Sequence, residues 1–271
     1  MADTLKIAAI SIDIVWGNPQ ANLEAVGRHL DKIPRDTDIV VVPELFTTGF
    51  IQDEDVLHEL SESSDGPTMK QVKEWCERYD WAMAGSYSAS ENGIIFNRAF
   101  FVQPDGKTTF YDKRHLFTPS AENRIYTAGR GLIPVTEFRD WKIAMMVCYD
   151  LRFPVWARNT GHAYDLMIVP ANWPHARGYA WEHLIIARAI ENQAVYVGCD
   201  RSGHDDYGDY DNLAMIVDAI GRPIHQQIEG EPILYATPSL ENIKKARRRL
   251  PTIDSADDFT FIEQFETAKK G

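Results

Sequence analysis

The sequence predicts an α/β fold in which two sheets pack face to face and helices cover their outer faces. Some expected strands are continuous apolar runs, as in residues 143–147, which suit parallel strands buried on both sides. Others flank turn-forming residues, as residues 94–103 and 108–112 flank Pro104 to Lys107, and indicate an antiparallel hairpin. A chain that mixes both kinds of strand with amphipathic helices buries its apolar surface as two sheets with helices outside.

The N-terminal part is expected to alternate strands and helices. Apolar residues alternate over 5–12 as in a strand, and residues 19–33 carry an apolar helical stripe. Residues 38–42 form a second, buried strand, and an acidic loop follows. Gly66 and Pro67 then begin a helix. Its inward positions are Met69, Val72, Trp75, Cys76 and Tyr79, which makes Cys76 a packing residue.

The central part continues with three expected strands. Residues 81–88 precede the hairpin described above, and residues 132–138 and 143–147 follow it. Phe153 and Pro154 then indicate the start of a helix, because proline is favoured in the first turn.

The next part predicts a strand, a long helix and a second strand. The strands are residues 165–170 and 194–199, and the helix between them covers 178–193. The helix has an expected buried face of Trp181, Leu184, Ile185 and Ile190. Residues 200–211 are acidic and contain glycine, but they miss the spacing of a calcium loop, so we expect a solvated loop.

The C-terminal part is expected to hold a second hairpin and a last helix. Residues 212–220 and 233–237 bracket the turn residues 221–223, and the helix covers 239–250. The tail, residues 251–271, contains three aromatic residues that need a surface to pack on, Phe259, Phe261 and Phe265. A second subunit can provide that surface.

Composition excludes several classes of function. The 271 residues carry 28 Lys and Arg against 40 Asp and Glu, a net charge of −12, so we expect no nucleic-acid partner and no membrane partner. The one basic cluster, residues 244–249, is expected to be a solvated face at a helix end. The N-terminus lacks the pattern of a secretion signal, and no apolar run is long enough to cross a membrane.

The cysteines and the uniform composition indicate which compartment, which cofactors and how many domains to expect. Cys76, Cys148 and Cys199 are too few for a disulfide framework and have no zinc spacing, so we expect a reducing cytoplasm, no metal and no cofactor. Without an internal repeat or a linker-like segment, one domain over residues 1–271 is expected.

Three residues whose side chains can take part in catalysis follow expected strands. Cys148 follows residues 143–147, Glu44 follows 38–42, and Lys113 ends the first hairpin. If these strand ends converge, Glu44 can act as a general base, while Lys113 and the Tyr149 N–H stabilise the thiolate and the oxyanion. The neighbouring helix start is also expected to favour the thiolate.

Each of these residues also has a purely structural interpretation. Glu44 can be a carboxylate at a helix start, Lys113 a surface charge at a hairpin end, and Cys148 a small core residue. Spacing alone does not decide between the two interpretations.

Several sequence blocks, which occur in a fixed order, favour the catalytic interpretation of these residues. The blocks VVPELFTTGF, YDKRHLF, VCYDLRFPVWARN, ANWP and ARAIENQAVYVGCDR resemble the successive signatures of the nitrilase (carbon–nitrogen hydrolase) superfamily. The resemblance implies a four-layer αββα sandwich that forms a homodimer or higher oligomer, with the tail 251–271 crossing between subunits. It also implies Glu44 as general base, Lys113 as oxyanion-stabilising residue, Cys148 as nucleophile, and Glu122 as the carboxylate that positions Lys113 and substrate.

Within the superfamily the blocks are most similar to those of omega-amidases. This likeness implies hydrolysis of the terminal amide of 2-oxoglutaramate or 2-oxosuccinamate, with the small amide and water as the only partners of the reaction. The substrate carboxylate then needs a cation, for which Arg177 is the first candidate, followed by Arg152, His115 and Arg201. We expect Arg152 instead to brace the turn through Asp150 or backbone carbonyls.

Further contacts to substrate are expected from residues near these blocks. The candidates are Tyr149, Phe117, Trp173 and Asn172. Phe117 and Trp173 can form pocket walls, although either can equally be a core residue.

Other functions stay open at this point. Within the superfamily, an N-carbamoyl-amino-acid hydrolase or an aliphatic amidase is the main alternative, and a true nitrilase follows. A second mechanism is a Cys–His hydrolase that uses one of four histidines, His115, His162, His175 or His183. A ligand-binding module and a glutaminase part of a synthetase are the alternatives from other classes.

Overall fold

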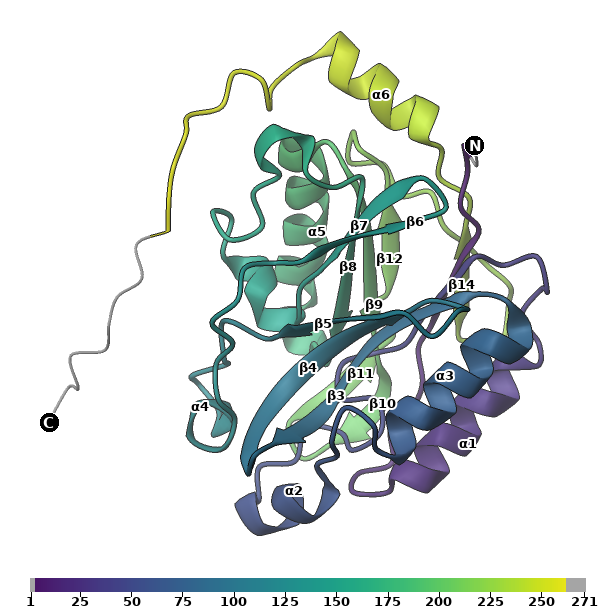
Figure 1. Ribbon diagram of the computed structural model, residues 1–271, viewed down its shortest axis with the longest axis vertical. Helices are drawn as coiled ribbons and strands as arrows, with labels where there is room; N and C mark the ends of the chain where they lie inside the picture. The colour runs from purple at the N-terminus through teal and green to yellow at the C-terminus, as the bar shows by residue number, and fades with distance from the viewer. Residues whose placement is uncertain (1–2, 262–271) are drawn as a thin grey trace, which may run out of the picture.

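The computed structural model describes residues 3–261, which form four layers in the order helix, sheet, sheet, helix (Figure 1). The first sheet has seven strands, in spatial order β13 (Gln226–Gln227), β14 (Ile233–Ala236), β1 (Ile7–Ile10), β2 (Ile39–Val41), β3 (Ala82–Glu91), β4 (Ile94–Val102) and β5 (Thr108–Asp112). The second has five, β12 (Met215–Val217), β9 (Val195–Asp200), β8 (Leu166–Ala171), β7 (Trp141–Met145) and β6 (Val135–Phe138). The predicted αββα sandwich is confirmed.

Helices cover the outer face of each sheet. Figure 1 shows α1 (Pro19–Leu30) and α3 (Pro67–Tyr79) over the seven-stranded sheet and α5 (Gly178–Asn192) over the five-stranded one. The remaining α-helices are α2 (Glu54–Leu60), α4 (Glu122–Ile125) and α6 (Leu240–Arg249), and the 3₁₀ turns are η1 (Cys148–Arg152), η2 (Thr160–His162) and η3 (His175–Arg177).

The two faces of each central strand pack against different layers. In β1, Ile7 and Ala9 belong to the core between the sheets, whereas Ala8 and Ile10 pack with α1 and α3. Successive side chains of a strand point to opposite faces, so a strand covered on both sides needs an apolar residue at every position. This explains the continuous apolar runs, in which each buried Val, Leu or Ile contributes about 1.5–3 kcal/mol.

The starts of α1 and α3 follow from local chemistry. Asn18 Oδ1 accepts a hydrogen bond from the Ala21 N–H at 3.1 Å, and Pro19 occupies the first turn. At α3, the Glu62 carboxylate accepts the Thr68 N–H at 2.7 Å beside Pro67. The predicted inward face of α3 is confirmed, and Cys76 is a buried packing residue there.

The helix predicted from Phe153 is wrong. The 3₁₀ turn η1 ends at Arg152, and turns lead from there to η2. Asn159 explains the difference, because its side chain binds the backbone of Tyr164 and of Asn192 at 2.8–3.0 Å. Such side-chain bonds to the backbone compete with helical hydrogen bonding.

The solvated loop predicted over 200–211 is also wrong. This segment forms a hairpin of β10 (Ser202–Asp205) and β11 (Gly208–Asp211), outside both sheets. Arg201 anchors the hairpin from within, because it is fully buried and pairs with Asp205 at 2.8 Å. The Tyr207 N–H donates to Asp205 Oδ1 at 2.8 Å and closes the turn.

The second hairpin predicted from 212–220 and 233–237 does not form. β12 pairs with β9 in the five-stranded sheet, and β14 pairs with β1 in the seven-stranded sheet. Each strand thus completes a different apolar core, and the connection between them crosses from one sheet to the other.

Three smaller predictions need correction. Ile190 does not belong to the buried face of α5, because its exposed fraction is 49%; the fully buried positions are Trp181, Ile185, Arg188, Ala189 and Asn192. Arg247 is not solvated, since it pairs with Asp165 at 2.8 Å. The helix α2 occupies a stretch that was predicted as loop.

The last described residues extend away from α6 along one side of the molecule (Figure 1). Phe261 contacts Trp156 edge-on with ring centroids 4.9 Å apart, and Phe259 contacts Phe261. Phe265 lies outside the described residues. Within residues 3–261, no helix combines the length and apolar character needed to span a membrane.

The first testable prediction concerns alkaline stability. Burial raises the pKa of Cys76 from 9.0 to about 12. The folded chain keeps this proton where the unfolded chain loses it, so stabilisation present below about pH 9 is lost as the pH rises toward about 12. We expect this thiol to lower the free energy of unfolding by about 1.4 kcal/mol per pH unit in that window.

Urea unfolding of wild type and Cys76→Ala, each at about pH 8 and about pH 10, tests this slope. The variant is expected to be less stable at both pH values but to lose less stability between them. Equal losses in the two proteins would contradict the prediction.

Candidate active site

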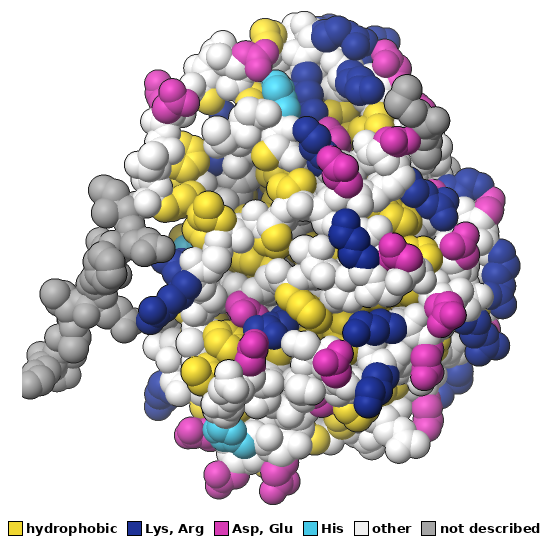
Figure 2. Space-filling model, in the orientation of Figure 1, with side chains coloured by type: hydrophobic (Ala, Val, Ile, Leu, Met, Phe, Trp, Pro, Cys, Tyr) yellow, Lys and Arg dark blue, Asp and Glu magenta, His cyan; other side chains and the backbone are white. Residues whose placement is uncertain are grey.

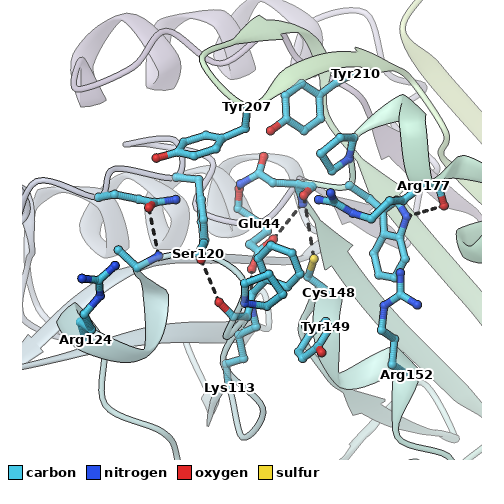
Figure 3. A pocket seen from close by; sticks show the side chains of 18 residues that line it. Glu44, Lys113, Ser120, Arg124, Cys148, Tyr149, Arg152, Arg177, Tyr207 and Tyr210 are labelled. Atoms are coloured by element: carbon cyan, nitrogen blue, oxygen red, sulfur yellow. Dashed lines mark hydrogen bonds and ion pairs between the residues drawn. The ribbon is translucent and has the colours of Figure 1, made fainter.

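The carboxyl ends of three strands bring Glu44, Lys113 and Cys148 together (Figure 3), and Asn172 at the end of a fourth strand lines the same cavity. β2 and β3 are parallel, as are β7 and β8. β4 is antiparallel to both β3 and β5, so β5 runs in the same direction as β3 and ends at the same edge. The convergence of the three strand ends expected from the sequence is therefore present in the structure.

The Lys113 ammonium lies between two carboxylates. Its Nζ is 2.9 Å from Glu44 Oε1 and 2.8 and 3.0 Å from the two oxygens of Glu122. All three side chains are at most 1% exposed. Burial alone lowers the pKa of Lys113, but Glu122 and Glu44 outweigh it and hold this pKa well above its ordinary value. Lys113 is therefore charged at neutral pH.

Glu122 reaches Lys113 from the short helix α4. Its Oε2 accepts the backbone N–H of Phe117, and its own N–H donates to Ser120 Oγ at 3.1 Å. Burial raises the pKa of Glu122, and Lys113 opposes that rise. The carboxylate implied by the family resemblance is thus in contact with Lys113.

Cys148 begins a sharp turn directly after β7. Its φ is +44°, a left-handed value that is uncommon outside glycine and is sustained by surrounding contacts. The fully buried Asp150 carboxylate supplies them, since it accepts from the N–H groups of Val147 at 3.2 Å and His115 at 2.8 Å, and from the Tyr111 hydroxyl at 2.8 Å. Asp150 therefore holds the turn that presents the thiol.

The surroundings of Cys148 favour the thiol over the thiolate. Burial raises its pKa well above the ordinary value, Glu44 raises it further, and Lys113 acts in the opposite direction. The prediction that the surroundings favour the thiolate is therefore wrong. The turn that follows Cys148 is a 3₁₀ turn of five residues rather than an α-helix, so its dipole is small against the cost of burying a charge.

Asn172 fixes the Glu44 carboxylate from the opposite sheet. Its backbone N–H donates to Glu44 Oε2 at 2.8 Å, and its Nδ2 donates to the Glu44 carbonyl oxygen at 2.9 Å. The Cys148 Sγ lies 4.0 Å from the Asn172 carbonyl oxygen. Asn172 is therefore next to both the thiol and the carboxylate.

These groups open into one cavity of about 380 Å³. The five residues predicted to contact substrate all line it, namely Phe117, Tyr149, Asn172, Trp173 and Arg177. The Arg177 guanidinium lies 5.1 Å from the centre of the Phe117 ring and, in Figure 3, reaches over the cavity above Cys148.

The predicted role of Arg152 as a brace for Asp150 is wrong. Asp150 is held by the donors given above, and the Arg152 guanidinium instead lies over the ring of Trp173 at 4.6 Å and near that of Tyr149 at 5.9 Å. Arg152 lines the same cavity.

Several residues of the cavity were not predicted from the sequence. They include Phe50, Gln52, Arg124, Tyr207 and Tyr210. Tyr207 and Tyr210 come from the hairpin that was predicted as a loop, and in Figure 3 they lie on the side away from Lys113. Arg124 follows Glu122 by two positions on α4, so its proximity to that carboxylate was a usable signal.

Two other candidate anchors lie elsewhere. His115 Nδ1 is 2.7 Å from Asp150 and its ring stacks on Phe153, and Arg201 is buried with Asp205. No histidine of the described chain lines the cavity, which argues against a Cys–His pair there. His162, His175 and His183 contact Asp254, Asp211 and the Tyr179 carbonyl. Residues 3–261 also contain no group of side chains arranged to hold a metal ion.

The second prediction concerns the energetic role of Lys113. Lys113→Met leaves Glu44 and Glu122 buried without their cation, and breaking such a pair costs about 3–5 kcal/mol. Two facing carboxylates raise each other's pKa, so the folded variant binds a proton more tightly than the unfolded one. Its stability is therefore expected to be higher at about pH 5.5 than at about pH 8.

Denaturant unfolding at both pH values measures this, with Lys6→Met as control. Lys6 pairs with Asp36 on the surface, where the two side chains are 49% and 66% exposed, so we expect a small loss in this variant. A Lys113→Met loss as small as the control's would contradict the prediction.

Comparisons with known proteins agree with this geometry. The sequence model of the carbon-nitrogen hydrolase family matches residues 6–248. The chain is 40% identical to Omega-amidase YafV of Yersinia enterocolitica, with 96% of this chain and 99% of the relative covered. It is 36% identical to Omega-amidase YafV of Escherichia coli K12, with 94% and 98% covered, and 29% identical to 2-oxoglutaramate amidase of Bacillus subtilis, with 92% and 96% covered.

Solved structures are similar along the whole chain. XC1258 from Xanthomonas campestris, described as a CN-hydrolase superfamily protein with an arsenic adduct in its active site, superposes with a TM-score of 0.89 at 34% identity, over 95% of this chain and 99% of that one. An amidase from Nesterenkonia shares the fold, with a TM-score of 0.78 at 18% identity over 91% of this chain and 96% of that one. The chain therefore belongs to the carbon-nitrogen hydrolase family.

Proposed function

We propose that the protein is an omega-amidase that hydrolyses the terminal amide of 2-oxoglutaramate or 2-oxosuccinamate to the 2-oxo diacid and ammonia. The observation that carries the proposal is the buried Cys148 thiol beside Glu44 and Lys113 in one cavity. Relatives that the chain matches over nearly its full length are named Omega-amidase and 2-oxoglutaramate amidase.

Acylation begins with the neutral thiol. Because burial and Glu44 raise the pKa of Cys148, the thiol needs a base during attack, and Glu44 is the carboxylate beside it. Glu44 accepts the proton while the sulfur bonds to the amide carbon and the carbonyl electrons move to oxygen. The Lys113 ammonium has three N–H donors. One N–H binds Glu44 and a second is shared between the two Glu122 oxygens, so the third serves the oxyanion together with the Tyr149 N–H.

Release of ammonia and entry of water complete the cycle. The tetrahedral intermediate collapses, its carbon–nitrogen bond breaks, and the nitrogen takes the proton from Glu44 to leave as ammonia. Glu44 then removes a proton from water, whose oxygen attacks the thioester carbon. Collapse of the second intermediate releases the carboxylic acid and returns the proton to the Cys148 sulfur. Glu122 holds Lys113 in place throughout.

Arg177 is the proposed anchor for the substrate carboxylate. It lines the cavity that contains Cys148 and stacks on Phe117, which leaves the edge of its guanidinium available for a bidentate contact. Within the described chain no carboxylate pairs with Arg177, so this cation has no internal counterion to displace. Phe117, Tyr149 and Trp173 then form apolar walls along the carbon chain, and Asn172 lies beside the reacting amide.

We also propose the setting in which the protein works. The chain acts as a single domain in the cytoplasm, where reducing conditions keep Cys148 and the two other free cysteines as thiols. It forms a homodimer or higher homo-oligomer, with residues 251–271 packing across subunits. The exposed side chains of Leu132, Val155 and Phe259 supply apolar surface for that contact.

The third prediction tests the activity itself. Purified protein is expected to release ammonia from 2-oxoglutaramate and not from N-carbamoyl amino acids or nitriles, in a coupled ammonia assay. Cys148→Ala abolishes release, Glu44→Gln folds but turns over little because an amide cannot accept the thiol proton, and Lys113→Ala loses at least roughly 10²–10³-fold.

The opposite substrate pattern would replace the omega-amidase by another amidase of the family. Robust turnover by folded Glu44→Gln would remove Glu44 as the base, and near-normal activity of Lys113→Ala would contradict its role at the oxyanion.

The fourth prediction concerns Arg177. Arg177→Leu is expected to lower kcat/KM for 2-oxoglutaramate by roughly 10–100-fold, the value of a lost charge-assisted contact. It should change little for an uncharged primary amide of the same length. Arg249→Leu, an exposed arginine at the end of α6, serves as the control. Equal losses on charged and uncharged amides would exclude Arg177 as the anchor.

A further inference from the structure

Asn97 contacts both carboxylates that flank Lys113. It lies within β4, is fully buried, and its Nδ2 donates to Glu44 Oε1 at 2.8 Å and to Glu122 Oε1 at 3.2 Å. One amide group thus bridges two acidic side chains that come from different elements. No feature of the sequence assigned a role to this residue.

The orientation of the Asn97 amide is determined by its other neighbour. Ser86 Oγ accepts the Leu45 N–H at 2.9 Å, so its own proton is available to Asn97 Oδ1, which lies at 2.9 Å. A flipped amide would turn its oxygen toward two carboxylates and its donors toward the hydroxyl. The chain of bonds from Leu45 through Ser86 therefore aims the amide donors at Glu44 and Glu122.

Counting donors distinguishes the two oxygens of Glu44. Oε1 accepts from Lys113 Nζ and from Asn97 Nδ2, and Oε2 accepts from the Asn172 N–H. A carboxylate oxygen has two lone-pair positions, so Oε1 is saturated and Oε2 retains one free position. The free position is the one available to the thiol proton.

We propose that Asn97 is a positioning residue that saturates Glu44 Oε1 and leaves Oε2 as the atom that takes the proton from Cys148. This inference rests on the proposed role of Glu44 as base. The amide also gives the two carboxylates a shared neutral donor, which favours their ionised forms beside one ammonium in a buried site.

Removal of the Asn97 amide is expected to move the acid limb of the pH profile in one direction, toward higher pH. Glu44 works as a base only when ionised, so uptake of a proton by the carboxylate cluster abolishes activity and sets the acid limb of the pH profile. Without Asn97 the negative form of the pair loses a donor, and the acid limb of kcat/KM moves to higher pH. The other ionisable groups around this pair are Lys113, Cys148, Tyr126 and Asp200, and Asn97→Leu replaces none of them.

The experiment compares Asn97→Leu with a matched control, Asn159→Leu. Asn159 is also fully buried, but it binds the backbone of Tyr164 and Asn192 away from the cavity. For Asn97→Leu we expect a kcat lowered roughly 10–100-fold at neutral pH, an acid limb raised by about one pH unit, and a KM within about twofold of wild type. Asn159→Leu is expected to lower Tm and leave the acid limb in place.

A second variant keeps the test decisive if Asn97→Leu does not fold. Ser86→Ala leaves the Asn97 amide in position but removes the proton that orients it, and it should move the acid limb in the same direction by a smaller amount. A folded Asn97→Leu or Ser86→Ala protein with an unmoved limb would overturn the proposal. An equal shift of the acid limb in Asn159→Leu would indicate that Asn97 has only a general packing role.

A readout without substrate separates this inference from the proposed function. The rate at which iodoacetamide alkylates Cys148, followed by mass spectrometry of the labelled peptide, depends on loss of the thiol proton to Glu44 and on no particular amide. If wild type does not hydrolyse 2-oxoglutaramate, the omega-amidase proposal fails. The positioning role is still supported if the rate of Cys148 alkylation in Asn97→Leu begins to rise at a higher pH than in wild type. An alkylation profile identical to that of wild type contradicts it.

Discussion

The buried ion pairs of Lys113 are the interaction on which the rest of the site depends. An ammonium taken out of water is tolerated only when partners compensate for its lost hydration, and here two carboxylates do so at 2.8–3.0 Å. The carboxylates of this cluster outnumber its one ammonium. Neutral donors from Asn97 and Asn172 supply further hydrogen bonds to Glu44, because buried carboxylates need such partners.

The layered fold was predictable where strands are covered on both faces. Such strands are apolar at every position, as residues 39–42 and 166–170 are, and their ends mark one edge of a sheet. The hairpin of β10 and β11 was not predictable in this way, since it lies outside both sheets and its polarity resembles that of a loop. The separation of β12 and β14 was also hidden, because a turn between two strands does not reveal which sheet each of them joins.

The site was predictable in its parts and less so in its electrostatics. Strand ends indicated Glu44, Lys113 and Cys148, and the family blocks added Glu122, whose loop has no regular pattern. The direction of the Cys148 pKa depends on burial and on the facing carboxylate, which a local pattern does not contain. Asn97 gave only a weak signal, since it lies beside Arg98 in a strand whose other residues are apolar. Arg152 shows the same limit, because its stacking on Trp173 depends on a neighbouring strand.

The contact between Glu44 and Asn172 joins residues that are 128 positions apart and that follow strands of different sheets. Neither sheet alone contains a thiol with a base and a cation beside it, since Cys148 and Asn172 follow strands of one sheet while Glu44 and Lys113 follow strands of the other. A partly folded chain therefore carries a cysteine of ordinary reactivity. Amide cleavage therefore requires that the two sheets have docked. A nascent or damaged chain, in which the core between the sheets is incomplete, lacks the assembled site.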